Sequence, residues 1–303
     1  MPNGQRIDEA LLFMDRRLKI PSAWSQLALF LLLLGGSILF TSVFVSLLAP
    51  GNRSVNGEKL LQMISTMGIF GLPAYFYAVM TSREPPLDFL GLRKTPHPAF
   101  YALAVVLLLF SFPFEGWLGQ INKNLPLSNW MINMEKEAEV KTAILLKTHS
   151  AIDIVINVIV IAAIPAIFEE ACFRGALQRI LIQIFKSPWV GITACAIFFS
   201  AMHFQFRGFL PRMFLGTLLG AIYWYSGSLW ASILAHFFTN GIQVVAVSFY
   251  PRLLTEDPSV PLYWAIISLV IVVGLLSVLR RRSTANYAEV YAEGTNDYDG
   301  FPE

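Results

Sequence analysis

The stretch IPAIFEEACFRGAL, residues 164–177, decides the fold, because it ends an apolar run long enough to cross a bilayer. The run begins near residue 151, and its end carries two adjacent carboxylates, Glu169 and Glu170, followed by Arg174. A charged side chain inside a membrane span costs about 2.5–3.5 kcal/mol on insertion scales, so those that persist face a bundle interior or an aqueous cavity. The stretch therefore predicts a membrane helix that carries a functional site.

The composition extends this prediction to the whole chain. The 303 residues are 55% hydrophobic and only 14% charged, and the mean hydropathy is +0.58, which lies outside the range of soluble globular domains. The formal net charge of +2 is small, and no dense basic stripe with interleaved aromatic residues occurs. Nucleic acid is therefore set aside as a partner, and membrane lipid is the expected surrounding.

Apolar runs and loop residues predict an all-α membrane protein with about eight transmembrane helices. A single polytopic membrane domain is expected over residues 1–282, and a disordered acidic tail over 283–303. The expected spans lie near residues 24–49, 61–80, 99–118, 151–173, 189–206, 211–226, 229–249 and 262–279.

The loops predict an orientation. Arginine and lysine residues cluster at 16–19 before the first span and at 280–282 after the last. By the positive-inside rule, both termini should be cytoplasmic, and we expect an integral protein of a bacterial plasma membrane. The loop 119–150 on the opposite side contains an amphipathic segment, 130–148, which is expected to lie at the membrane interface as a surface cover.

In the second half of the chain, polar residues inside the expected spans yield one candidate set; elsewhere Glu115 lies at the edge of the third span. Glu170 and Arg174 on the fourth span are four positions apart and can pair, whereas Glu169 is turned by about 100° from Glu170. Glu170 is then the structural carboxylate and Glu169 the free one. The other members are His203, four positions after Phe199 on the fifth span, and His236 and Asn240 on the seventh.

A helical hairpin would bring these residues to one level. If the fourth span continues to a turn at 186–188, Glu169 and Glu170 lie level with His203 on the antiparallel fifth span. The four-residue spacing of His236 and Asn240 points both toward one spot, so a polar layer is expected between spans 4, 5 and 7. Gly216 and Gly220 form a G-x-x-x-G, which is expected to be a close-packing face.

This set is sufficient for peptide hydrolysis. A carboxylate near a histidine, here Glu169 with His203, can position and deprotonate a water. His236 and Asn240 offer N–H donors for the oxyanion that forms when water attacks a peptide carbonyl. No cofactor is required, although Glu169, His203 and His236 are also a plausible zinc set. The H-E-x-x-H motif of the zincins is absent.

Three motifs in this order resemble the CPBP family, the CaaX-processing and bacteriocin-processing intramembrane proteases, also called the Abi family. They are EEACFR at 169–174, FSAMH at 199–203 and HFFTN at 236–240, within a resemblance that covers about 150–250. The resemblance implies an eight-helix endopeptidase in which Glu169 and His203 activate water and His236 and Asn240 form the oxyanion site. Glu170, Arg174 and Phe199 are the expected structural support.

Two classes of function follow. The first is an intramembrane endopeptidase that cleaves membrane-associated or prenylated-type proteins or peptides by a metal-free glutamate mechanism, with a metalloprotease as the variant. The alternative is a non-catalytic membrane scaffold or bacteriocin-immunity protein in which the polar layer joins helices. A proton-coupled transporter would also use buried Glu and His, but its inverted repeats and broken helices are not found in the sequence.

Overall fold

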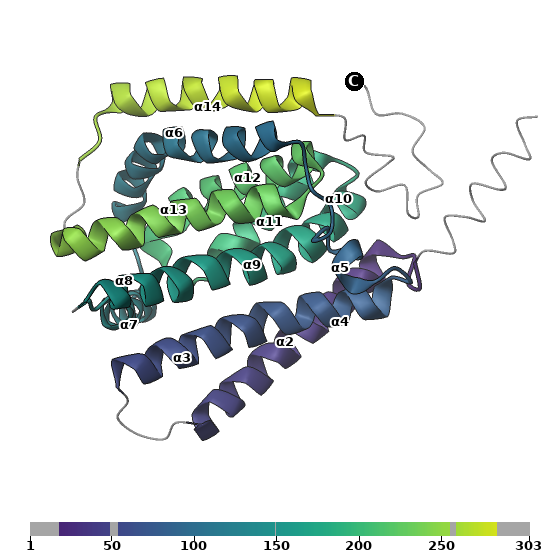
Figure 1. Cartoon of the computed structure of the whole chain (residues 1–303), viewed down its shortest axis with the longest axis horizontal. Coiled ribbons are helices and arrows are strands. Elements are labelled where there is room, and N and C mark those ends of the chain that lie inside the picture. Colours follow the sequence, from purple (N-terminus) through teal and green to yellow (C-terminus); the bar gives the residue numbers. More distant parts are fainter. Residues whose placement is uncertain (1–17, 49–53, 149, 255–258, 284–303) are drawn as a thin grey trace, which may run out of the picture.

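A computed structural model describes residues 18–48, 54–148, 150–254 and 259–283. These residues form helices packed side by side (Figure 1), and the described part of the chain contains no strand beyond an isolated bridge between Leu18 and Ser82. The expected all-α membrane protein is confirmed. The predicted acidic tail lies outside the described residues, except for Ser283.

The helices follow one another with short connections. They are α2 (Ala23–Leu48), α3 (Val55–Thr66), α4 (Leu72–Thr81), α5 (Pro86–Phe89), α6 (Pro98–Lys123), α7 (Asn129–Leu145), α8 (Ala151–Asn157), α9 (Ile164–Glu170), α10 (Arg179–Phe185), α11 (Pro188–Ala201), α12 (Phe209–Ser226), α13 (Leu229–Phe249) and α14 (Leu262–Arg282). In Figure 1, α2 to α4 form one side of the bundle and α14 the opposite side, with α8 to α10 running between α3–α4 and α13.

Six helical segments of the described chain are long and apolar enough to cross a membrane. They are Ala23–Leu48, Val55–Thr81, Pro98–Lys123, Ala151–Phe185, Leu229–Phe249 and Leu262–Arg282.

The expected spans 5 and 6 differ from this set. The first, predicted at 189–206, is the 14-residue helix α11, which ends at Ala201. Its chain turns there because Phe204 takes a left-handed backbone angle, φ 52°, before α12 begins. The other, predicted at 211–226, is α12, which is not among the six segments.

The fourth span is longer than expected. It runs without a break from Ala151 to Phe185, 35 residues instead of ending near 173. Its second half contains Arg174, Gln178 and Arg179, each buried, and these side chains are tolerated because they bind carbonyl groups of neighbouring helices. The predicted turn is confirmed, since α10 ends at Phe185 and α11 begins at Pro188.

Three wide, π-helical segments interrupt the long spans. Met67–Gly71 joins α3 to α4, Val158–Ala163 joins α8 to α9, and Ala171–Gln178 joins α9 to α10. The first two end shortly before a proline, Pro73 and Pro165. Because proline has no N–H and its ring clashes with the carbonyl four residues earlier, a wider turn accommodates it.

The G-x-x-x-G of α12 is a close-packing face, as predicted. A Cβ atom at Gly216 would lie 3.1 Å from the Cβ atom of Ala196 on α11, and one at Gly220 would lie 2.6 Å from Oε1 of Gln178. α12 can therefore approach α11 and the Ala171–Gln178 segment only because both positions are glycine.

Candidate active site

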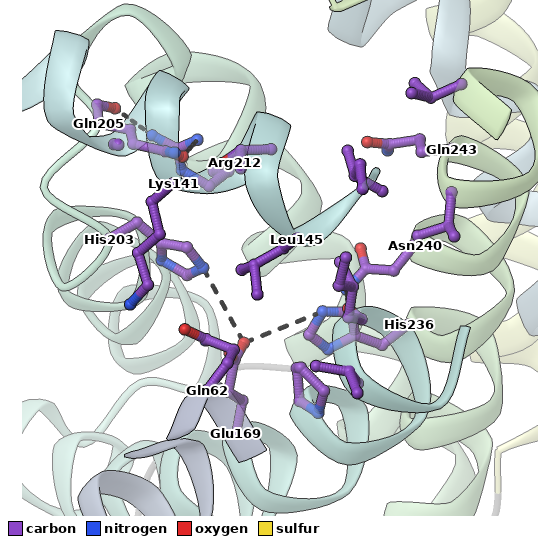
Figure 2. Close-up of a pocket in the computed structure, with 18 of the residues that line it drawn as sticks. Gln62, Lys141, Leu145, Glu169, His203, Gln205, Arg212, His236, Asn240 and Gln243 are labelled. Carbon is purple, nitrogen blue, oxygen red and sulfur yellow. Dashed lines mark hydrogen bonds and ion pairs between the residues drawn. The ribbon is translucent and has the colours of Figure 1, made fainter. Parts of the chain in front are cut away.

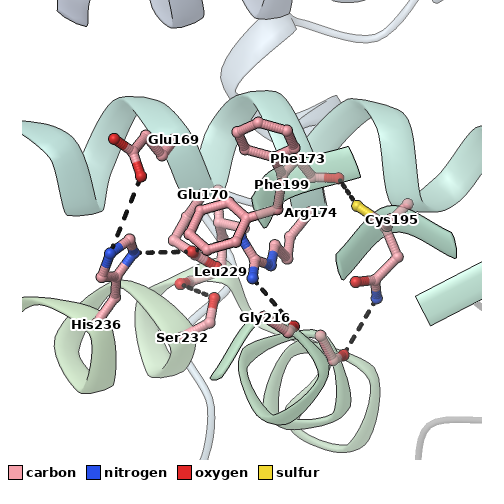
Figure 3. Close-up of polar contacts among 12 residues, drawn as sticks. Glu169, Glu170, Phe173, Arg174, Cys195, Phe199, Gly216, Leu229, Ser232 and His236 are labelled. Carbon is pink, nitrogen blue, oxygen red and sulfur yellow. Dashed lines mark hydrogen bonds and ion pairs between the residues drawn. The ribbon is translucent and has the colours of Figure 1, made fainter. Parts of the chain in front are cut away.

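The two carboxylates lie at the end of α9, where the π-helical segment Ala171–Gln178 begins. Glu170 is 0% exposed and Glu169 is 7% exposed. The two side chains point to different neighbours (Figure 3), as the helical geometry predicts for adjacent residues. π-Helical turns are frequently found at functional sites, and here the widened turn directly follows the carboxylates.

Glu170 is the centre of a buried network. Its Oε1 lies 2.8 Å from Nη1 of Arg174, the ion pair expected from their spacing. The same oxygen lies 3.0 Å from Nδ1 of His236 on α13 (Figure 3). Glu170 therefore holds both the arginine on its own helix and the histidine on another, a second partner that the sequence spacing could not indicate.

Arg174 joins the network to two further helices. Its Nη2 donates a hydrogen bond of 3.1 Å to the carbonyl of Gly216 on α12. Its guanidinium carbon lies 4.6 Å above the ring of Phe199 on α11, a cation–π contact. Phe199 also makes edge contacts with His203 and His236. The expected supporting residues are thus in contact with each other and with both histidines.

His203 lies in the turn after α11 rather than within a span. Its Nδ1 lies 2.8 Å from the carbonyl oxygen of Phe199. The turn is held from two sides, because Nδ2 of Asn122 donates to the carbonyl of Phe206 at 2.8 Å and the backbone N–H of Arg207 donates to Glu135 at 2.8 Å. The backbone between α11 and α12 is therefore anchored to α6 and α7.

Both histidines face Glu169. Nε2 of His203 and Nε2 of His236 each lie 4.0 Å from Oε2 of Glu169 (Figure 2). A carbonyl oxygen can only accept, so Nδ1 of His203 donates to Phe199 and the neutral ring keeps a lone pair on Nε2. His236 is oriented in the same way by Glu170. The expected level of Glu169 and His203 is thus observed.

A cavity of about 590 Å³ opens over these groups. Glu169, Phe199, His203, His236 and Asn240 all line it, so the structure brings the predicted catalytic residues to one space. Glu170 and Arg174 are not among the lining residues and lie behind it.

Asn240 contacts the long helical span that carries the two carboxylates. Its Nδ2 lies 3.5 Å from the carbonyl oxygen of Ile161, a long contact. In an α-helix this carbonyl would accept from residue 165, which is Pro165 and has no N–H. Ile161 lies in the π-helical segment Val158–Ala163; Pro165 offers its carbonyl no N–H, and Asn240 reaches it across the bundle.

The helix α7 takes part in the site. It begins at Asn129 and ends at Leu145, close to the amphipathic segment predicted at 130–148. Its Lys141, Thr142 and Leu145 line the cavity, so α7 forms part of the cavity wall.

Sequence reasoning missed several polar residues of the cavity. Arg212 lay at the start of an expected span, which is a signal that could have been used. Gln243 lay inside the expected span 229–249, three positions after Asn240, so the shared helix face was also a signal. Gln62 and Gln205 lay at the ends of expected spans and Lys141 in a loop, and these three gave no such signal.

The spacing of the donor atoms bears on the zinc alternative. A tetrahedral zinc with bonds of about 2.0–2.1 Å brings its ligand atoms to about 3.3 Å from one another. Oε2 of Glu169 is 4.0 Å from each Nε2, and the described residues hold no group of three or more His, Cys, Asp or Glu arranged to bind a metal ion. The observed spacing is wider than a zinc site requires.

Comparison with known proteins identifies the segment that carries these residues. Residues 151–242 match the family described as type II CAAX prenyl endopeptidase, Rce1-like. The resemblance to the CPBP family is confirmed. Residues 151–242, referred to below as the CPBP segment, make up less than half of the chain. They include every predicted site residue from Glu169 to Asn240.

The CPBP match supports a CAAX-type intramembrane endopeptidase in an integral membrane protein. Comparisons with curated proteins and with solved structures find no match. Part of the cavity comes from outside the CPBP segment, since Gln62, Lys141 and Gln243 line it.

Proposed function

We propose that this protein is a metal-free intramembrane endopeptidase that cleaves membrane-associated or prenylated-type proteins or peptides, in a bacterial plasma membrane with both termini cytoplasmic. One observation carries the proposal. Oε2 of Glu169 is 4.0 Å from the Nε2 atoms of His203 and His236, inside a cavity of about 590 Å³. One water about 2.8 Å from Oε2 and from an Nε2 atom would bridge this separation.

The chemistry follows from the acceptors. Glu169 and Nε2 of His203 each accept a hydrogen bond from the water. As the water oxygen attacks the carbonyl carbon of the peptide, its proton passes to Glu169. The tetrahedral intermediate then collapses, the C–N bond breaks, and the leaving nitrogen takes the proton from Glu169. Glu169 is the general base and then the general acid, and His203 orients the water.

The oxyanion needs donors on the other side of the carbonyl. Nδ2 of Asn240 has a second N–H besides the one directed at Ile161, and it can donate to the oxyanion. His236 donates from Nε2 when its ring carries protons on both nitrogens, with the Glu170 carboxylate at 3.0 Å balancing the charge of the ring. Glu170, Arg174 and Phe199 act through these residues as positioning groups.

The test compares purified wild-type protein with Glu169→Gln on a library of membrane-tethered peptides that includes prenylated ones. Glutamine keeps the size of the side chain and removes the base. We expect cleavage to be lost in Glu169→Gln and retained in Glu139→Gln, a matched exchange at an exposed position of α7. Both variants should retain the thermal stability of the wild type.

A zinc chelator separates the two mechanisms. We expect cleavage to continue in its presence. Loss of cleavage with chelator, restored by zinc, would replace the metal-free mechanism with a metalloprotease. Cleavage that persists in Glu169→Gln would overturn the role of Glu169. No cleavage by folded wild-type protein would favour the non-catalytic scaffold or immunity function.

A further inference from the structure

The cavity is lined by two cationic side chains that form no ion pair with a carboxylate of the described residues. Arg212, near the start of α12, lines the cavity, and within the described part of the chain its hydrogen bonds go to Gln205 alone. Its Nε is buried and has no hydrogen-bond partner among the described residues. Lys141 lines the cavity from α7, and no hydrogen bond or ion pair of its side chain occurs within the described part of the chain.

Among the described residues, the nearby carboxylates form no ion pair with Arg212, and Glu135 and Glu169 act on its charge only from a greater distance. Glu169 is the only acidic residue among those that line the cavity. Glu170 is paired with Arg174 and His236 behind the wall, and Glu135 accepts the backbone N–H of Arg207. The cavity lining therefore carries two cations and one carboxylate, Glu169, which is assigned to the catalytic water. A buried polar group without a partner is costly, and the Nε of Arg212 is such a group among the described residues, so an anionic group beside Arg212 would be stabilising. Lys141 is exposed and contributes charge without a cost of burial.

The guanidinium of Arg212 is held in place for such a group. Nη1 donates to Oε1 of Gln205 at 2.9 Å, and Nη2 donates to the carbonyl oxygen of the same residue. Both partners are neutral, so they fix the orientation without cancelling the charge. The free Nε–H remains, and a planar guanidinium matches the two oxygens of a carboxylate. Gly208 permits this arrangement, because a Cβ there would lie 2.5 Å from Nη1.

Lys141 adds a second positive charge to the same cavity. Figure 2 shows its side chain extending from the Arg212 end in the direction of Glu169. An ammonium group on a flexible stem can follow an anion without fixed geometry. Arg212 thus supplies orientation and Lys141 supplies additional charge.

We propose that Arg212, assisted by Lys141, binds a carboxylate of the substrate peptide and so determines which peptides are cleaved. The carboxylate is either the free C-terminus or an acidic side chain close to the scissile bond. This inference rests on the proposed peptidase function. Arg212 is a specificity residue in it and takes no part in the proton transfers assigned to Glu169.

The test removes the negative charge from the peptide and the positive charge from the protein, first separately and then together. One peptide pair has a free C-terminal acid or a C-terminal amide, and a second pair has Glu or Gln near the cleaved bond. The kcat/KM of wild-type protein should favour the charged member of one pair by roughly 10- to 100-fold. Arg212→Gln should remove that preference by lowering the kcat/KM of the charged peptide to that of the uncharged one. The pair that responds identifies the source of the carboxylate.

Three further variants keep the test decisive. Lys141→Gln lies on an exposed position of α7 and should reduce the preference several-fold even if Arg212→Gln does not fold. Arg207→Gln removes a positive charge from the segment just before α12, at a residue that does not line the cavity. This variant should keep the full preference. Arg212→Lys should keep part of it, because the charge remains and the planar fork is lost.

Binding measured with the Glu169→Gln protein separates this inference from the proposed function. If that protein binds the charged peptide more tightly and Arg212→Gln in the same background abolishes the difference, the inference holds even without turnover. It is overturned if neither pair shows a preference in cleavage or binding, or if the preference survives in Arg212→Gln and Lys141→Gln. It is also overturned if the effect of Arg212→Gln depends on anionic lipid and not on the peptide.

Discussion

Nδ1 of His236 lies 3.0 Å from Oε1 of Glu170, and both side chains are buried. This contact joins α13 to α9 and turns Nε2 of the same ring toward Glu169. Because Arg174 forms an ion pair with the same oxygen at 2.8 Å, the carboxylate next to the proposed base holds a cation and a histidine through one oxygen atom. The two adjacent glutamates are therefore expected to respond differently to the same substitution.

Glu170→Gln should reduce both stability and activity. Removing one partner of a buried ion pair leaves the other charge uncompensated, at a cost of about 3–5 kcal/mol. Glu169→Gln leaves no such charge and should keep the wild-type melting temperature while losing activity. Thermal unfolding in detergent, measured beside cleavage, checks this. Equal melting temperatures for the two variants would show that the Glu170 network is not what stabilises the bundle.

Asn240→Ala should act mainly on kcat. Loss of one oxyanion donor costs about 10²- to 10³-fold in kcat. The donor binds the carbonyl of the bound substrate more weakly than the oxyanion of the transition state, so KM should change little. Ser248→Ala on the same helix is a suitable control, since its hydroxyl donates within the helix to Val244. An increase in KM with unchanged kcat would assign Asn240 to substrate binding instead.

Pro165→Ala tests how Asn240 is positioned. Alanine supplies an N–H at position 165 that can compete with the Asn240 amide for carbonyl oxygens of the Val158–Ala163 segment, including that of Ile161. A fall in kcat of about 10-fold or more is expected from the misplaced donor. The double variant Pro165→Ala with Asn240→Ala should be no slower than Asn240→Ala alone. Additive losses of kcat in the double variant would show that Pro165 does not act through Asn240.

Gly220→Ala should destabilise the bundle. The added Cβ would lie 2.6 Å from Oε1 of Gln178 and 2.8 Å from Cγ2 of Ile192, and such overpacking costs about 1–3 kcal/mol. Gly274→Ala on α14 is the matched control, because nothing lies within 4 Å of its added Cβ. Thermal unfolding of both variants gives the comparison. A melting temperature of Gly220→Ala equal to that of Gly274→Ala would contradict the close-packing role.

Local geometry explains which parts of the site could be predicted. Four-residue spacing on a helix does not depend on the rest of the fold, so the pairing of Glu170 with Arg174 followed from the sequence. The turn near Lys186 placed Glu169 and His203 at the same height on two antiparallel helices. That height also follows from counting residues along each helix. The six long apolar segments were also visible as apolar runs.

The remaining parts depend on packing between helices. The contact of Glu170 with His236 joins residues 66 positions apart, and no periodic pattern encodes it. The early end of α11 at Ala201 arises because the following loop is anchored by Asn122 and Glu135 from other helices. Arg212 and Lys141 were missed because they matter through the cavity they share, which exists only after α7 and α12 have packed.

The π-helical segment Ala171–Gln178 also fixes the length of the chain at this point. Arg174 and Gln178 bind the carbonyls of Gly216 and Gly220 on α12, and both pairs are four positions apart. Deleting one residue between Gln178 and Arg174 would turn the two side chains by about 100° relative to each other, so only one of them could still meet its carbonyl. A substitution here changes the contacts of one buried residue, whereas a deletion would change the register of every later helix against the carboxylates. We therefore expect the residue count of this segment to be less variable than its residue types.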